Sequence, residues 1–575
     1  MTIARTAPPS NRRSFYGNVA ELLGFATASH ARAVAFLILV SLVSFLPGFF
    51  HLPPIDRDEA RFAQATKQMI ESDDYIDIRF QDEVRYKKPV GIYWLQASVV
   101  RTAEALGVPE ARTTIALYRI PSLIGAIGAV LLTYWSALAF VTRRSAYLAA
   151  LMVATAVLLG VEARLAKTDA ALLACCVAAM GVMARAYLRE RQDWTRELRF
   201  AHVAMFWTAL AAGILIKGPL ILMVAGLAIV ALGVADRSLR WVLRLRPVIG
   251  IAWMLLLVLP WFIAIMSRSG EAFIVESAGQ DLWGKVFHSA EGHGAPPGYY
   301  LLLFWITFWP AAPLAAVAAP AVWRNRREAG TRFLLAWVVP SYLVFELVVT
   351  KLPHYVLPLY PAIAILVARE IERRSLSDNP HLVRTAVMWP ILTALLPVLG
   401  VGLLIYLRGQ FGWLAWPFAA GGVIFGFYAW RLYDIEGAEV SLARATIGAQ
   451  MMGIAVFGVL LPLMRPLFPS PTLAEYLKAA GCADPVVASA GYQEPSLVFL
   501  VGTHTRLVDG ATAAEILQGG TCRFALIEQR QERAFAQRAE LIGLRYSLRG
   551  RLDNAFNTNG GRWISIAVYG SGREP

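Results

Sequence analysis

Acids and lysines stand in a few short stretches between long apolar runs, in combinations that could catalyse group transfer. Asp58 and Glu59 begin the stretch "DEARFAQATKQM", which follows closely on an apolar run. Asp169 in "AKTDA" comes directly before another apolar run. A carboxylate can activate an attacking hydroxyl group, and cations beside it can stabilise charge on a phosphate. These residues therefore indicate a site that activates a hydroxyl beside a bound phosphate.

Three lysines share one local pattern, in which a proline follows within two residues. They are Lys88 in "KKP", Lys217 in "KGP" and Lys351 in "KLP". Proline is well tolerated at the first helical position, so each lysine is predicted to lie at a helix N-terminus. That end of a helix favours anions over cations, and its free N–H groups together with a lysine can bind phosphate. The alternative is that each lysine extends to lipid headgroups.

The acids also have local alternatives. Asp58 could act only as the N-cap of a helix, with Arg61 as its partner three residues later. Asp169 could likewise cap the helix that follows it. The sequence leaves both explanations open beside the catalytic one.

The composition indicates an integral membrane protein. The 575 residues are 57% apolar and 16% charged, with a formal net charge of +14. The arginines that carry much of this charge lie in short gaps between apolar runs, which is the positive-inside pattern and not a nucleic-acid surface. Thirteen runs are near the length that a bilayer requires; they are approximately 33–51, 116–140, 145–161, 169–187, 203–216, 218–235, 247–267, 298–320, 333–350, 356–369, 385–406, 411–430 and 443–463.

The arginines also predict which connectors face the cytoplasm. Clusters fall in alternate connectors, around Arg143, Arg189, Arg240, Arg326 and Arg373. Residues 1–32 are then a cytoplasmic segment without a cleavable signal, and 52–115 is the first outer loop. The odd number of spans places the tail, 470–575, on the outer side as well.

The tail is predicted to be a small α/β domain. Strand-like runs ("VVASA", "TRLVDG", "RFALIEQ", "WISIAVYG") alternate with helical ones. Cys482 and Cys522 both lie in it, so an oxidising compartment would allow a disulfide, with two free thiols as the alternative. The sequence shows no internal repeat, nucleotide loop or metal motif of recognised spacing.

Five motifs taken in order resemble a known family. "RDEARFAQATKQMIESDDYI", "RYKKPVGIYWLQA", "KTDA", "KGP" and "KLPHYVLPLYPAIAIL" are similar to the motifs of the GT-C membrane glycosyltransferases, within residues 33–370. The most similar branch is the 4-amino-4-deoxy-L-arabinose lipid A transferase type, which is related to protein O-mannosyltransferases. The resemblance implies about thirteen transmembrane helices in a domain over 33–465, a catalytic first outer loop and a C-terminal periplasmic α/β domain.

The resemblance also implies the site. It places "RDEAR" at the floor of the catalytic cavity, with the apolar stripe of Phe62, Ala65 and Met69 behind it on the lipid. The resemblance implies two catalytic acids, Asp58 and Asp169. It also implies a set that binds the carrier phosphate: Arg61, Lys88, Lys217, Tyr355 and, in place of a family arginine, Lys285. Further candidates are Glu59, Lys87, Lys351 and the loop histidines His288 and His293.

One position departs from the family pattern. Family members often carry an acid before the phosphate lysine, whereas this chain has Lys87. The change removes a carboxylate that could bind a cation, so the sequence does not decide whether a divalent metal binds at the site. A second lysine also suits a neutral or acidic sugar better than an amino sugar.

The implied activity is transfer of a sugar from a polyprenyl-phosphate carrier to an acceptor outside the bacterial inner membrane. The expected acceptor is lipid A or lipopolysaccharide, or another envelope molecule; no nucleotide or nucleic acid is expected to take part. A protein or glycan acceptor is an alternative within the same fold. A flippase or transporter of lipid-linked sugars is a further alternative, disfavoured because transporters tend to show internal repeats and midplane charges.

Overall fold

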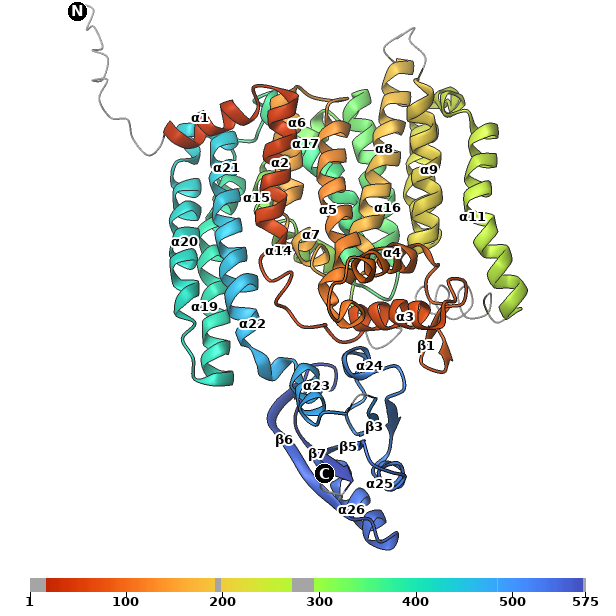
Figure 1. Cartoon of the computed structure of the whole chain (residues 1–575). Helices are drawn as coiled ribbons and strands as arrows, with labels where there is room; N and C mark the ends of the chain where they lie inside the picture. Colours follow the sequence, from red (N-terminus) through yellow and green to blue (C-terminus); the bar gives the residue numbers. More distant parts are fainter. Residues whose placement is uncertain (1–16, 192–197, 271–272, 274–293, 483, 572–575) are drawn as a thin grey trace, which may run out of the picture.

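The computed structural model describes residues 17–191, 198–270, 273, 294–482 and 484–571. Long helices pack side by side over most of the chain, and a smaller unit with a β-sheet lies below their lower ends in Figure 1. Between the two parts run the shorter helices of the first outer loop. The structure therefore has a helical bundle, a crossing layer and a sheet-containing unit.

The helices of the bundle follow the predicted apolar runs closely. They are α1 (Gly17–Ala26), α2 (His30–Phe45), α5 (Ile115–Ala137), α6 (Arg143–Thr155), α7 (Val157–Glu162), α8 (Asp169–Arg191), α9 (Phe200–Lys217), α10 (Leu220–Asp236), α11 (Pro247–Ser269), α14 (Tyr299–Thr307), α15 (Ala312–Arg324), α16 (Ala329–Leu347), α17 (Tyr360–Glu372), α18 (Pro380–Val383), α19 (Met388–Arg408), α20 (Trp416–Arg431), α21 (Tyr433–Gly453) and α22 (Leu461–Leu463).

The number of spans differs from the prediction of thirteen. Within the described residues, seven helices are long and apolar enough to cross a membrane, and α2 and α10 are shorter apolar helices. The predicted run 298–320 is divided between α14 and α15. The multi-pass helical character is confirmed, whereas the count of thirteen is not.

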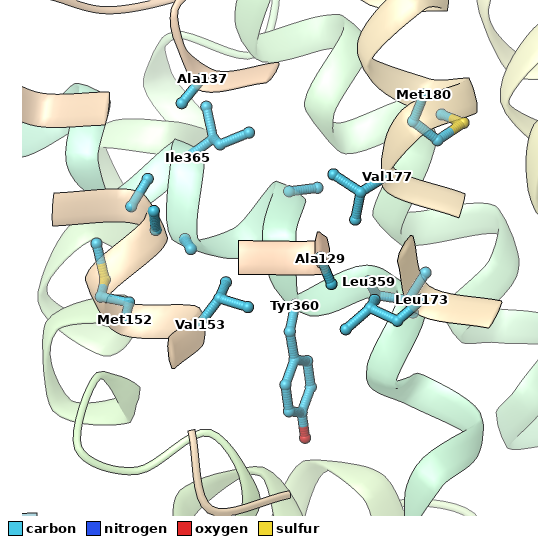
Figure 2. Packing of buried hydrophobic residues seen from close by; sticks show 14 of the residues in the cluster. Ala129, Ala137, Met152, Val153, Leu173, Val177, Met180, Leu359, Tyr360 and Ile365 are labelled. Carbon is cyan, nitrogen blue, oxygen red and sulfur yellow. The ribbon is translucent and has the colours of Figure 1, made fainter. Parts of the chain in front are cut away.

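Small side chains let the central helices approach closely. Figure 2 shows Ala129 of α5 beside Val177 and Leu173 of α8, with Ile365 of α17 on the same core. Gly125 of α5 faces the backbone of α8, and a Cβ added there would lie 2.6 Å from the Cα of Ala171. Glycine and alanine at helix contacts are typical of membrane bundles, where backbones must pack without large side chains between them.

The first outer loop contains α3 (Asp58–Ser72), β1 (Arg79–Phe80), β2 (Glu83–Val84) and α4 (Gly91–Ala105). In Figure 1, α3 and α4 lie across the lower ends of the bundle helices. The expectation that Phe62, Ala65 and Met69 lie on lipid is wrong. All three are buried against protein, in a cluster that includes Tyr93 of α4 and Trp261 of α11.

The C-terminal unit has a five-stranded sheet in the order β4-β3-β5-β7-β6. Strand β3 is parallel to β4 and β5, and the β5/β7 and β7/β6 pairs are antiparallel. Its elements are α23 (Pro469–Ala479), β3 (Val486–Ala490), α24 (Pro495–Val501), β4 (Arg506–Val508), α25 (Gly510–Gln518), β5 (Arg523–Glu528), α26 (Glu532–Leu541), β6 (Tyr546–Asn557) and β7 (Arg562–Ser571). A small C-terminal α/β unit is confirmed, and β6 and α24 are additions that the sequence did not predict.

A disulfide joins Cys482 to Cys522, across a sequence separation of 40 residues. It ties the chain after α23 to the start of β5. A crosslink of this length restricts the unfolded chain and stabilises the folded one, by about 4 kcal/mol from chain entropy.

We expect the double variant Cys482→Ser/Cys522→Ser to lower the unfolding temperature of the protein and to leave its elution volume unchanged. Thermal unfolding with and without reductant measures this. Reductant should lower the unfolding temperature of the wild type and not that of the variant. Rapid alkylation of both cysteines in the unreduced wild type would contradict the crosslink.

Candidate active site

A buried ion pair fixes the start of α3. Both side-chain oxygens of Glu59 accept from the guanidinium of Arg119 on α5, at 2.7 and 2.9 Å, and neither side chain is more than 1% exposed. Arg119 also donates to the carbonyl oxygens of Phe49, Leu52 and Pro53. The arginine thus joins α5 to the segment after α2 and to the start of α3.

The same carboxylate reaches two more segments. Glu59 accepts from the backbone N–H groups of Ile55 and Ala166, each at 2.9 Å. Ala166 lies in the turn between α7 and α8, three residues before Asp169. The candidate Glu59 therefore links the start of α3 to α5 and to the turn before α8.

Asp58 is the first residue of α3, and its side chain is exposed. The residue before it, Arg57, has φ 70° and ψ −108°, a conformation that costs a non-glycine residue about 1–3 kcal/mol. Arg57 occupies the N-cap position, so the idea that Asp58 is the N-cap is wrong. The Asp58 carboxylate lies near enough to Lys167 to favour its ammonium form, and near enough to Tyr93 to oppose loss of its hydroxyl proton.

Asp169 lies in a buried cluster of opposite charges. Its carboxylate accepts from Lys217 and lies 3.7 Å from Lys167 Nζ. Lys167 also donates to Glu162, at 3.3 Å. These side chains come from α7, α8, α9 and the turn 162–168, so the cluster lies where the ends of three bundle helices meet.

His354 and Tyr355 complete the cluster from the turn before α17. The ring nitrogens of His354 lie 3.6 Å from Glu162 and 3.7 Å from Asp169. The ammonium group of Lys217 lies 5.6 Å from the ring centre of Tyr355. Lys88 is near enough to His354 for an electrostatic effect, which brings the first outer loop to the same place.

Two residues of the segment 162–168, Glu162 and Lys167, have shifted pKa values. Burial raises the pKa of Glu162, and Lys167 offsets only part of that effect. Burial alone would lower the pKa of Lys167, but Glu162 and Asp169 outweigh it and hold the pKa above its usual value. Lys167 therefore remains an ammonium group, and Glu162 takes up a proton at a higher pH than an exposed glutamate does.

Glu162, Asp169 and His354 also have the geometry to hold a cation. One ligand atom from each lies within 4.8 Å of the others, and Glu162 Oε2 has no hydrogen-bond partner among the residues that the structure describes. Two lysines already compensate the two carboxylates, however, and a divalent ion would have to displace them. The donor set as it stands forms an ion-pair network and does not match a metal site.

The predicted place at a helix N-terminus is wrong for Lys217, whereas Lys351 comes one residue before the N-cap of the 3-10 helix Pro353–Leu359. Lys217 is the last residue of α9, where the dipole favours a cation. Lys351 follows the end of α16 and donates to the carbonyl oxygen of Val348 at 2.8 Å. The positive charges are compensated by distant residues and by carbonyl groups, which the local sequence does not reveal.

Of the predicted set, Asp169, Lys217 and Tyr355 lie together, and Asp58 and Lys88 lie within electrostatic range of Lys167 and His354 of the same cluster. Arg61 lies in the first turns of α3, where its charge acts on Asp56. Lys87 is exposed, and Lys351 is buried beside α16. Lys285, His288 and His293 lie outside the residues that the structure describes.

Four members of the site were missed from the sequence: Arg119, Glu162, Lys167 and His354. Each stands in or beside an apolar run, and a charge in such a place normally has a partner or a function. That signal could have identified Arg119 in "ALYRIPS". Nothing local could have paired it with Glu59, which lies 60 residues away.

We expect Arg119→Met to lower the free energy of unfolding by about 3–5 kcal/mol, because it leaves the Glu59 carboxylate buried without its cation. The double variant Glu59→Gln/Arg119→Met should recover part of that loss. Thermal unfolding in detergent measures both. An unfolding temperature for Arg119→Met equal to that of wild type would contradict a structural role for the pair.

Comparison with known proteins supports the resemblance found in the sequence. A family model for dolichyl-phosphate-mannose-protein mannosyltransferases matches residues 103–270. An undecaprenyl phosphate-alpha-4-amino-4-deoxy-L-arabinose arabinosyl transferase from Erwinia tasmaniensis is 27% identical over 344 residues, which are 57% of this chain and 58% of that protein. The protein of the same name from Pectobacterium carotovorum is 27% identical over 366 residues, 61% of each chain. The chain thus spans about three fifths of the length of these curated relatives.

A solved structure shares the fold. The crystal structure of ArnT from Cupriavidus metallidurans bound to undecaprenyl phosphate superposes with a TM-score of 0.70. The identity is 18%, and the match covers 94% of this chain and 98% of that one. The similarity to membrane glycosyltransferases that the motifs predict is confirmed, and this chain is a multi-pass membrane protein with the GT-C fold.

Proposed function

We propose that this protein is an integral membrane glycosyltransferase. It moves a sugar from a polyprenyl-phosphate carrier to lipid A, lipopolysaccharide or another envelope acceptor. The observation that carries the proposal is the buried cluster in which Lys217 contacts Asp169 and lies 5.6 Å from the ring centre of Tyr355, with Asp58 and Lys88 of the first outer loop within electrostatic range of it. The curated relatives named as arabinosyl transferases support this choice of reaction.

The location follows from the same reasoning. The protein lies in a bacterial inner membrane with its N-terminus in the cytoplasm. The first outer loop, 52–115, and the C-terminal domain, 470–575, then face the periplasm, and the membrane domain extends over 33–465. The crossing of α3 and α4 beneath the bundle, on the side of the C-terminal unit, supports this arrangement (Figure 1).

In the proposed mechanism, the carrier phosphate binds beside Lys88, Lys217 and Tyr355. The acceptor hydroxyl oxygen forms a bond to the anomeric carbon from the opposite face, and the bond from that carbon to the phosphate oxygen breaks. The bonding electrons leave with the phosphate, whose growing charge the cations stabilise. Asp58 accepts the hydroxyl proton, so the sugar is transferred with inversion.

Asp169 has a supporting role in this scheme. It holds Lys217 through a direct hydrogen bond and is buried, whereas Asp58 is exposed. If the acceptor is itself a phosphate, no base is needed, and Asp58 stabilises the positive charge that develops on the sugar ring.

A protein hydroxyl is the second candidate acceptor. The match of residues 103–270 with the model of the mannosyltransferases favours it, because that model describes transfer to protein. The donor chemistry and the roles of Asp58 and Lys88 are the same in both cases.

The function is tested with purified protein in detergent. Polyprenyl-phosphate forms of aminoarabinose, galacturonic acid, a neutral hexose and a pentose are offered with lipid A and core lipopolysaccharide, and products are followed by mass spectrometry. We expect a mass increment of one sugar. No transfer from any donor to these acceptors or to a protein acceptor, in a preparation that still binds the carrier, would overturn the proposal.

Asp58→Asn should reduce transfer by about a hundredfold or more, because the amide cannot accept the proton, and carrier binding should remain. Lys88→Ala should weaken carrier binding as well as transfer. Asp82→Asn is the matched control, since Asp82 is an exposed acid of the same loop whose side chain is 91% exposed. Wild-type turnover by Asp58→Asn would remove Asp58 from the mechanism.

A further inference from the structure

The C-terminal unit contacts the first outer loop at the residues directly before Asp58. Arg57 Nε donates to Asn559 Oδ1 at 2.6 Å, from the loop to the turn between β6 and β7. Asp56 Oδ1 accepts from the backbone N–H of Ser496, in the first turn of α24, at 2.9 Å. Two consecutive residues of the loop are therefore held by a part of the chain more than 400 positions away.

Asn559 is itself held in place. Its side-chain amide donates to Glu494, and its backbone N–H donates to Asn557 Oδ1 at 2.9 Å. The carboxamide that accepts from Arg57 thus has a fixed orientation. A contact with a fixed partner can hold a strained backbone, whereas a contact with a mobile side chain cannot.

The helix that carries Ser496 is anchored in the loop by its apolar face. Phe499 of α24 is fully buried in a cluster with Ala63 of α3, Tyr118 of α5 and Ala166 of the turn before α8. Its backbone carbonyl accepts from Lys67 at 3.0 Å. The unit is therefore docked through both apolar and polar contacts, and its position relative to α3 is defined.

We propose that the C-terminal unit is a positioning part of the catalytic centre, in which Asn559 and the start of α24 hold Asp56 and Arg57 so that Asp58 points to the reacting atoms. This inference rests on the proposed function, because it assigns Asp58 as the acid that meets the acceptor. Arg57 adopts its positive φ against its own preference. The contacts from Asn559 and Ser496 act on both residues of that turn.

The first test removes the contact from the far side. Asn559→Ala should lower kcat for sugar transfer by about tenfold, with the KM for the donor and the binding of the carrier unchanged, because a small misplacement of a reacting group costs rate more than affinity. Arg506→Ala is the control, since it removes a contact of the same two parts, to Asp82, away from Asp58. We expect Arg506→Ala to turn over as wild type does.

The second test separates the effect of the Arg57 backbone conformation from the effect of its side-chain contacts. Arg57→Gly and Arg57→Ala both lose the guanidinium contacts, but glycine adopts positive φ without strain and alanine does not. The proposal requires Arg57→Gly to retain several-fold more activity than Arg57→Ala, at equal unfolding temperatures. Equal kcat for the glycine and alanine variants, or wild-type kcat for Asn559→Ala, overturns it.

The two proposals fail in different ways. If wild-type protein transfers no sugar in any donor and acceptor combination, the proposed function fails, and the positioning role fails with it. If the wild type transfers sugar and Asn559→Ala does so equally fast, only the role of the C-terminal unit is wrong. Asn559→Ala could instead lose activity because it unfolds at the assay temperature. If its unfolding temperature falls below the assay temperature and Arg57→Gly is no more active than Arg57→Ala, the contact serves stability, and this result also overturns positioning.

Discussion

The pairing of Glu59 with Arg119 is the constraint on which the rest of the site depends. A charge taken out of water must find a partner, and here the two side chains meet through two hydrogen bonds while both are buried. Glu59 adjoins Asp58 in sequence and binds the N–H of Ala166, three residues before Asp169. One carboxylate thereby links the segments that carry Asp58 and Asp169 to α5.

Charge compensation continues through the neighbouring cluster. Lys167 and Lys217 meet Glu162 and Asp169, so the two cations and two anions balance in a buried setting. In the proposed mechanism, a carrier phosphate beside Lys217 shares that ammonium group with Asp169. The attraction between Lys217 and the phosphate then grows as the sugar bond breaks, because the departing phosphate gains charge. The cluster is thus suited to favour the transition state over the bound donor.

The sequence was a good guide to the bundle and a poor one to its contacts. Apolar runs located the helices because a bilayer demands length and hydrophobicity, which are local properties. The stripe of Phe62, Ala65 and Met69 was placed on lipid, yet it packs on Tyr93 and Trp261. Hydrophobicity predicts burial and does not say whether lipid or protein provides it.

The C-terminal unit shows the same limit. Strands β3, β5 and β7 were predicted from their buried apolar runs, whereas β6, "YSLRGRLDNAFN", alternates exposed and half-buried residues and lacks such a run. The pairing of the charged residues could not be predicted from the sequence either, since Lys217 and Asp169 lie 48 positions apart. Motif resemblance supplied the acids and lysines of the site, but only the fold could supply Arg119, Glu162 and His354.

Asp58 stands at the joint between the membrane bundle and the C-terminal unit, and its neighbours on the two sides face different partners. Asp56 and Arg57 bind the C-terminal unit, and Glu59 binds α5. In the proposed mechanism, the exposed carboxylate of Asp58 meets a donor carried on a membrane lipid and an acceptor outside the membrane. A loop attached on one side alone would leave that carboxylate free to move. Attachment on both sides explains how an exposed side chain can keep a defined direction without being buried.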